Sequence, residues 1–292
     1  MSKKAKQNNL SMEIEKNLIY LYCVTNKAPE LKGVEDLVEG VYSIYQDGLY
    51  AVVSRVFEDE FGEKNLKKNL GDIEWLTARV RIHEGVIEGV MRNTCVVPFK
   101  FATLFNSENS LKAMLKEHAR DIKTNLQDLE GKEEWGVKIY GHIERLKEVL
   151  FKQDEGLLAL DKELCSASAG KAFFLKKKKE GLLNTIVNEG VNRYGQDSFE
   201  RLSKQSIRSR INKLLPKEVT EREEDMILNS AFLVEKERVH TFMGIVEFLK
   251  TQYKESGLSF DCTGPWPPYN FCVSVQATAK QGKKDCKMDT VK

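Results

Sequence analysis

Two hydrophobic periods alternate along this chain of 292 residues, and their order constrains the fold more than any other feature. Short runs rich in β-branched and aromatic residues, typical of strands, are followed by longer runs with apolar residues three and four positions apart, typical of helices. No run approaches the roughly 18 apolar residues that a membrane-spanning helix needs. We therefore expect a mixed α+β protein that does not enter a membrane.

The first half of the chain is expected to contain a strand, a hairpin, a helix, a strand and a second helix. The run LIYLYCVT at 18–25 indicates a buried strand. Asp47 and Gly48 between two apolar runs indicate a hairpin, because both residues tolerate positive φ. VVPFKFAT at 96–103 indicates a strand at an edge or a bulge, and the spacing predicts one helix over 107–131.

The second half is expected to run strand, helices, strand, strand, helix, strand. A main helix begins at Ser168, carries Phe173 among its apolar residues and is ended by Pro216. This order is the split βαβ arrangement of a ferredoxin-like sandwich, an antiparallel sheet with helices on one face. The runs with strand character in this half are WGVKIYG (135–141), EVTERE (218–223), ILNSAFLVEK (227–236), LSFDC (258–262) and NFCVSV (270–275).

Four segments follow from these patterns. Residues 1–17 and 276–292 are polar and lack apolar periodicity, so we expect a disordered arm and a disordered tail. A helix end and a polar turn at 131–134 mark the boundary between two domains. We therefore predict an N-terminal α+β domain over 18–133 and a C-terminal ferredoxin-like domain with long helices over 134–275.

The composition excludes several classes of function. The chain has 46 Lys and Arg residues and 44 Asp and Glu residues, which gives a net charge of +2. This charge produces no overall electrostatic field that would attract nucleic acid or an anionic membrane. It has no glycine-rich phosphate loop, and its four histidines and six cysteines lack the spacing of a metal site. We predict no catalytic, cofactor-binding or metal-binding residues. No secretion signal begins the chain, so we expect a cytoplasmic protein.

Two charged features leave alternative functions open. His83 and Glu84 match the first two residues of the HExxH zinc-binding motif, but Ile87 occupies the position of the second histidine ligand. His83 is therefore interpreted as a core or interface histidine bonded to backbone. The alternative is a small-molecule enzyme with a site around Arg79, His83 and Glu84. A lysine run at 176–179 is interpreted as a solvated helix face, and its alternative is an adaptor that binds nucleic acid through this run and the basic tail.

The segment TGPWPPYNF at 263–271 is the most distinctive motif. Proline fixes φ and removes a backbone donor, so the segment is a stiff loop and not the interior of a sheet. One interpretation is a structural clasp over a domain edge, and the other is a rigid aromatic platform for a partner. The candidate residues are Pro265, Trp266, Pro267, Pro268 and Tyr269.

These residues, taken with other segments in the same order, resemble the gas vesicle protein F/L family. The match extends from about residue 18 to 273, and it is specific because many motifs occur together. The matching segments are LIYLYCV (18–24), GLYAVVSRV (48–56), RVRIHE (79–84), VVPFKFATLF (96–105), EWGVKIY (134–140), AGKAFFLKKK (169–178), AFLV (231–234) and GPWPPYNF (264–271).

The resemblance implies an accessory or minor structural protein of gas vesicles, the air-filled shells that give microbes buoyancy. It implies a protein without catalytic activity, whose partners are the major gas vesicle shell protein and other gas vesicle accessory proteins. It also implies two α+β domains, of which the second has a modified ferredoxin fold. The motifs do not distinguish the F member from the L member.

Overall fold

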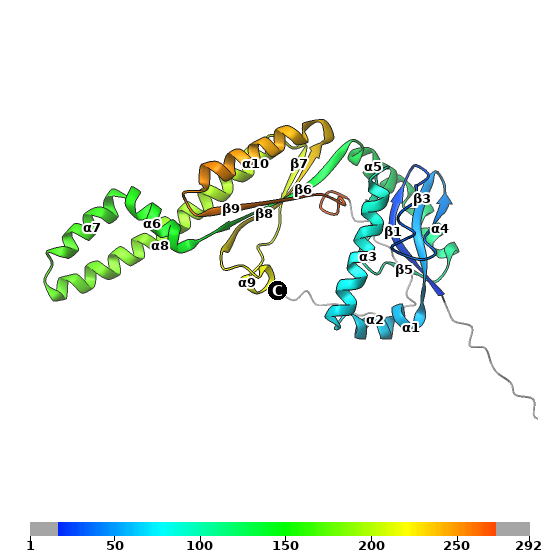
Figure 1. Cartoon of the computed structure of the whole chain (residues 1–292), viewed down its shortest axis with the longest axis horizontal. Helices are drawn as coiled ribbons and strands as arrows, with labels where there is room; N and C mark the ends of the chain where they lie inside the picture. The colour runs from blue at the N-terminus through cyan, green and yellow to red at the C-terminus, as the bar shows by residue number, and fades with distance from the viewer. Residues whose placement is uncertain (1–16, 273–292) are drawn as a thin grey trace, which may run out of the picture. The chain divides into compact units, whose positions relative to one another are not determined.

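The computed structural model describes residues 17–272, which form two compact units, 17–128 and 129–272 (Figure 1). Each unit combines helices with an antiparallel sheet, which confirms the expected mixed α+β content. None of the helices in the described range is both long and apolar enough to cross a membrane. Asn17 already belongs to the first strand, and the expected arm before it and tail from 276 lie outside the described residues.

The first unit is built around strand β1, which pairs with β3, β4 and β5 in a five-stranded sheet. The predicted hairpin is confirmed, because Asp47 and Gly48 have φ of +52° and +81° between β2 and β3. The elements are β1 (Asn17–Thr25), β2 (Tyr42–Gln46), β3 (Leu49–Phe57), α1 (Glu58–Phe61), α2 (Glu63–Asn69), α3 (Ile73–Met91), β4 (Val97–Pro98), β5 (Leu104–Phe105), α4 (Glu108–Glu117) and α5 (Ala119–Leu129).

Two elements of this unit differ from their predictions. The strand expected over 96–103 is reduced to β4, and the chain turns away at Ala102, which has a φ of +58° that no regular strand adopts. The helix expected over 107–131 is two helices, because the backbone at His118 leaves the helical region with φ −103° and ψ 12°. Ser107 caps α4 by accepting a hydrogen bond from the backbone N–H of Ser110.

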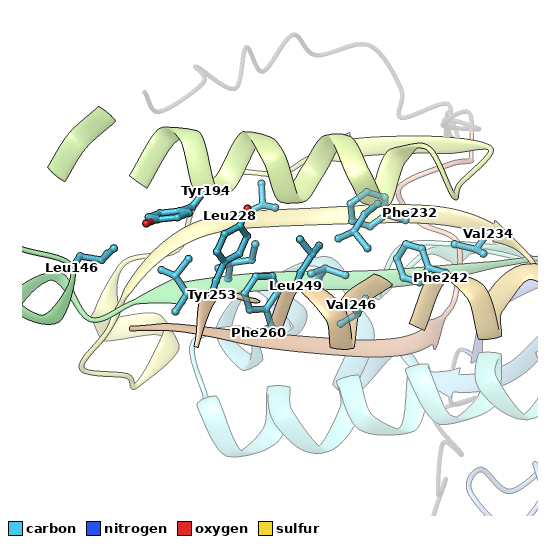
Figure 2. Packing of buried hydrophobic residues seen from close by; sticks show 14 residues of the cluster. Leu146, Tyr194, Leu228, Phe232, Val234, Phe242, Val246, Leu249, Tyr253 and Phe260 are labelled. Carbon is cyan, nitrogen blue, oxygen red and sulfur yellow. The ribbon is translucent and has the colours of Figure 1, made fainter. Parts of the chain in front are cut away.

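The second unit has a four-stranded sheet in the order β7-β8-β6-β9, with every neighbouring pair antiparallel. Side chains on one face of this sheet pack against α8 and α10, and Figure 2 shows that layer. The elements are β6 (Lys132–Gly141), α6 (Ile143–Gln153), α7 (Glu155–Cys165), α8 (Ala169–Ser203), β7 (Arg208–Ile211), α9 (Lys217–Thr220), β8 (Asp225–Glu235), a 3-10 turn (Lys236–Arg238), α10 (Val239–Tyr253) and β9 (Leu258–Trp266).

The prediction of one long helix up to Pro216 is wrong. Helix α8 ends at Ser203, and residues 208–211 form the edge strand β7. Ile207 and Ile211 are four residues apart, which fits the helical period and also the even spacing of a strand face. The backbone decides in favour of the strand, since the N–H of Ile207 donates to the carbonyl of Leu233 in β8.

Two predicted strands are also corrected. In the segment 218–223, residues 218–220 belong to the short helix α9, which Pro216 precedes as N-cap and which stops at Glu221, where φ is +53°. The described part of 270–275 is a turn, because the backbone N–H groups of Phe271 and Cys272 both donate to the carbonyl of Pro268. The last three residues of that predicted strand lie outside the described range.

Candidate functional site

The segment 263–271 was expected to be a loop throughout, but residues 263–266 belong to strand β9 and pair with β6. Strand β9 lies at the edge of the sheet, which agrees with the expectation that prolines are excluded from a sheet interior. Pairing between β6 and β9 is irregular here, because Thr263 lies opposite Gly136 and Trp266 opposite Glu134. Gly264 has a φ of +142°, and a Cβ on it would lie 2.9 Å from the carbonyl oxygen of Glu134. Only glycine fits this position without moving the strand beside it.

The motif divides into buried and exposed residues. Pro267 and Pro268 are buried, whereas 42% of Trp266 and 36% of Tyr269 are accessible to solvent. The indole N–H of Trp266 donates a hydrogen bond of 3.0 Å to the hydroxyl of Thr263. Trp266 is therefore oriented by its own strand but is not a core residue, and Pro265 beside it is also exposed.

Glu134 anchors the end of the motif to the sheet. Its carboxylate accepts hydrogen bonds from the backbone N–H of Asn270, at 3.0 Å, and from the side-chain amide of Asn270, at 2.6 Å. Glu134 is 4% exposed, and this burial raises the pKa of its carboxyl from 4.5 to about 7, although the hydrogen bonds and Arg210 act in the opposite direction. The carboxyl therefore titrates near neutral pH.

Strand β7 supplies further contacts to the same turn. The Arg210 guanidinium donates to the carbonyl of Asn270 at 3.4 Å, and the Arg208 guanidinium lies 5.5 Å from the ring centre of the buried Phe271. Sequence reasoning missed Glu134, Arg208 and Arg210, since no local pattern links them to a loop far along the chain. The motif is therefore clasped at Asn270 and Phe271 and exposes its aromatic residues before that point.

Arg79 lies on α3 in the first unit and is held by a carboxylate. Its guanidinium forms a salt bridge of 2.5 Å with Glu60 of α1, and Glu60 also accepts a hydrogen bond from the indole of Trp75 at 2.7 Å. The same guanidinium lies 6.0 Å from the ring centre of Phe61. Arg79 thereby links α3 to α1.

His83 is buried in the core of the first unit, 1% exposed, with both ring nitrogens engaged. Nε2 lies 3.1 Å from the carbonyl of Phe99, which can only accept, so Nε2 carries the proton. Nδ1 then accepts from the hydroxyl of Tyr20 at 3.0 Å, and that hydroxyl accepts from the N–H of Ala102. Burial lowers the pKa of His83 from 6.5 to about 4, so the ring is neutral.

A cavity of about 220 Å³ lies beside these residues and is lined in part by Tyr20, Ser54, Arg79, His83 and Phe101. The structure brings Arg79 and His83 together here, while Glu84 is partly buried one position further along α3. Both nitrogens of His83 and the guanidinium of Arg79 are committed to protein groups. A general base needs a nitrogen aimed at a reacting group, so this geometry favours a structural role.

Two further features of the sequence concern metal ligands and the lysine run. Within residues 17–272 no group of three His, Cys, Asp or Glu side chains is arranged to hold a metal ion. In the lysine run, Lys176, Lys177 and Lys178 are exposed, whereas Lys179 bonds to Asp161 and lies 4.6 Å from the ring centre of Phe151. The run thus divides between a solvated face and a packed one.

Comparison with known proteins assigns the family. Residues 18–273 match the family described as gas vesicle synthesis protein GvpL/GvpF. The chain belongs to this family. The resemblance drawn from the motifs is thereby confirmed, and the chain is a gas vesicle family protein involved in gas vesicle formation.

Relatives of both named types are similar to this chain. Gas vesicle protein L of a Streptomyces species is 26% identical, covering 87% of this chain and 92% of the relative. Gas vesicle protein F1 of Halobacterium salinarum is also 26% identical, covering 84% of this chain and 87% of the relative. Because an L relative and an F relative match at equal identity, these similarities do not show whether the chain is of the GvpL or the GvpF type.

Two solved structures share the fold. The crystal structure of GvpF from an Anabaena species has a TM-score of 0.66 and covers 88% of this chain and 99% of its own. That of GvpF from Microcystis aeruginosa has a TM-score of 0.61 with the same coverage. Both are 18% identical to this chain.

Proposed function

We propose that this GvpL/GvpF family protein takes part in nucleation and assembly of the gas vesicle shell, and that it acts through contacts with the major shell protein and other accessory proteins. In this proposal it works in the cytoplasm and at the gas vesicle, without catalysis and without a cofactor, nucleic acid or membrane. The exposed aromatic residues of the clasped proline motif carry the proposal. Trp266 and Tyr269 remain accessible on a segment whose following turn is fixed by Glu134 and Asn270.

A clasped aromatic loop suits protein recognition for a physical reason. Binding orders the side chains and loops at an interface, and that ordering costs free energy. Prolines at 265, 267 and 268 and the two hydrogen bonds to Glu134 have already restricted this loop. Trp and Tyr are also the residues most enriched where interfaces gain their binding energy.

The two compact units support a matching proposal for the domains. We infer that the chain folds as two domains, expected over 18–133 and 134–275, and that the second is a modified ferredoxin-like domain whose first strand, β6, begins at Lys132. The strand order β7-β8-β6-β9 supports this. Strands β6 and β7 run parallel with the antiparallel β8 between them, and β8 and β9 run parallel with the antiparallel β6 between them, which is the split βαβ arrangement. The C-terminal part of α8 packs on the sheet as the first crossover helix, and α6, α7 and the N-terminal part of α8 are the modification.

The function is tested by measuring binding of the full chain to purified major shell protein. Trp266→Ala and Tyr269→Ala should each weaken binding by about 2 kcal/mol, the size expected of a hot spot. Tyr45→Ala is the matched control, because Tyr45 is an exposed aromatic residue on β2, and it should bind like the wild type. Wild-type chain that does not bind, or loop variants that bind as tightly as the control, would refute the proposed contact.

A second measurement separates a lasting component from a transient one. Purified gas vesicles can be washed in high salt and probed for this chain. Retention after washing indicates a vesicle component, whereas loss with intact binding to unassembled shell protein indicates an assembly factor. Absence of any effect on vesicle formation when the chain is deleted would contradict the assembly role.

A further inference from the structure

The helices α7 and α8 form a hairpin with a defined inner face. Helix α7 and the N-terminal part of α8 lie side by side beyond the end of the sheet of the second unit, whereas the C-terminal part of α8 packs on the sheet (Figure 1). Leu157 and Leu160 of α7 and Leu175 of α8 are buried. Lys171 on α8 also pairs with Glu163 on α7 at 2.8 Å. These contacts fix which side of α8 faces its neighbour.

Phe173 and Phe174 lie on the outer side of the hairpin. They are 67% and 73% exposed, and their ring centres are 5.8 Å apart at an interplanar angle of 80°. Phe173 was counted with the periodic apolar residues of this helix, but it does not share the buried side of Leu175. A helix turns by about 100° per residue, so Phe173 lies roughly 200° around the helix from the buried Leu175.

Two glycines leave the helix flat around this aromatic pair. A side chain built on Gly170 or Gly181 would meet no atom within 4 Å. At about 100° per residue, these glycines and Lys177 fall within the same arc of roughly 100° as the two rings. We call these five residues, Gly170, Phe173, Phe174, Lys177 and Gly181, the hairpin surface. Gly170 and Gly181 carry no side chain on this face, so a partner can approach the helix backbone at these two positions.

The charge beside the hairpin surface is positive. Lys176, Lys177 and Lys178 are exposed. The neighbouring carboxylates are Glu180 on the same helix and Glu163 of α7, which pairs with Lys171 and interacts with Lys178. Acidic groups on a partner would therefore meet lysines at the rim, and charge complementarity of this kind directs association and orientation. An exposed apolar feature with a charged rim is typical of a protein interaction site.

We propose that the hairpin surface docks Phe173 and Phe174 into an apolar groove of a partner protein whose rim carries Asp or Glu carboxylates. This site is separate from the proline motif. It rests on the proposed function only in that the partner is sought among gas vesicle proteins. Nucleic acid fits less well, because Lys176 to Lys178 spread over roughly 200° of the helix. A membrane fits less well, because amphipathic helices that bind lipid bury a continuous apolar face, and here two rings stand among Gly and Lys.

The test measures binding of the full chain to each purified gas vesicle protein and to vesicles containing phosphatidylserine. One variant carries Phe173→Ser with Phe174→Ser, and another carries Lys176→Glu, Lys177→Glu and Lys178→Glu. Their matched controls are Phe248→Ser, an exposed Phe on α10, and Lys67→Glu with Lys68→Glu, exposed lysines on α2. Circular dichroism of each variant checks that the fold is retained.

The proposal predicts that at least one gas vesicle protein binds the wild type and both controls equally, and binds each hairpin variant at least ten-fold more weakly. The affinity for that partner should also fall with rising salt. Normal binding by both hairpin variants would overturn the inference while leaving the proposed function intact. Binding to the lipid vesicles that depends on the Phe pair would overturn it in favour of a membrane. No binding by the wild type to any gas vesicle protein would overturn both proposals.

Discussion

Glu134 and Asn270 are 136 positions apart in the chain and are joined by two hydrogen bonds to one buried carboxyl group. The pair ties the first strand of the second unit to the turn at the end of the proline motif. Because the carboxyl is desolvated, its charge is costly, and Asn270 offsets only part of that cost. The geometry of the motif is thus coupled to the protonation of a single side chain.

The stability of the second unit should depend on pH through Glu134. Folding raises the pKa of this carboxyl from 4.5 to about 7, so the folded state binds more protons than the unfolded state between these values. The favourable contribution is complete below pH 4.5 and is lost as the pH rises through 7, a loss of about 3 kcal/mol. Urea unfolding of the wild type and Glu134→Gln from pH 4.5 to 8 measures it. A stability difference between the two that does not change with pH would contradict the raised pKa.

His83 should give the opposite dependence in the first unit. Burial lowers its pKa from 6.5 to about 4, so the unfolded state binds more protons between these values. Its contribution is complete above pH 6.5 and is lost as the pH falls through 4, about 3 kcal/mol in all. His83→Gln should remove this slope in urea unfolding. Because the two slopes oppose each other, each variant must be compared with the wild type, and an unchanged acid slope in His83→Gln would refute the assignment.

Features set by neighbouring residues were predictable from the sequence. The turn at Asp47 and Gly48 needs only two residues that accept positive φ, and the cap at Ser107 needs only one hydroxyl near the start of a helix. The even spacing of Ile207 and Ile211 fits a helix or a strand equally. Pairing with β8 decides in favour of the strand, and the local sequence pattern does not predict that pairing.

The candidate site was predictable in part for the same reason. Prolines in sequence indicate a stiff loop, but they do not say which residue secures it. Glu134 and Arg210 reach Asn270 only after the sheet has formed. The exposure of Phe173 likewise depends on which side of α8 packs against α7, and an apolar residue on a helix does not reveal that side by itself.

Gly264→Ala should destabilise the second unit by at least about 2 kcal/mol. An L side chain at φ +142° is strained, and its Cβ would lie 2.9 Å from both the Glu134 carbonyl oxygen and the Trp135 ring. Gly244→Ala is the control, because it lies within α10 with no atom within 4 Å of the new Cβ. That change should stabilise the protein by about 0.5–1 kcal/mol. Equal effects of the two substitutions on the urea midpoint would contradict the close packing at Gly264.

Trp266→Ala should cost about 1 kcal/mol of stability, less than a core substitution. The indole is 42% exposed and makes one hydrogen bond, to Thr263, so truncation removes a smaller fraction of buried area than it does at a core position. Phe271→Ala removes a buried ring that Arg208 covers and should cost about 3 kcal/mol. Chemical denaturation of both variants makes the comparison. A larger loss for Trp266→Ala than for Phe271→Ala would show that the exposed indole, and not the turn after it, secures the loop.

The two units should unfold in separate transitions because their buried cores are built from different residues. Ile87 belongs to the core of the first unit and Phe232 to that of the second. Trp75 reports on the first unit, and Trp135 and Trp266 on the second, so replacing either set with Phe isolates the fluorescence of one unit. Ile87→Ala should shift only the transition seen by Trp75, and Phe232→Ala only the other, each by about 2–5 kcal/mol. If both substitutions moved both transitions equally, the units would be folding as one cooperative body, and the proposed division into two domains would be wrong.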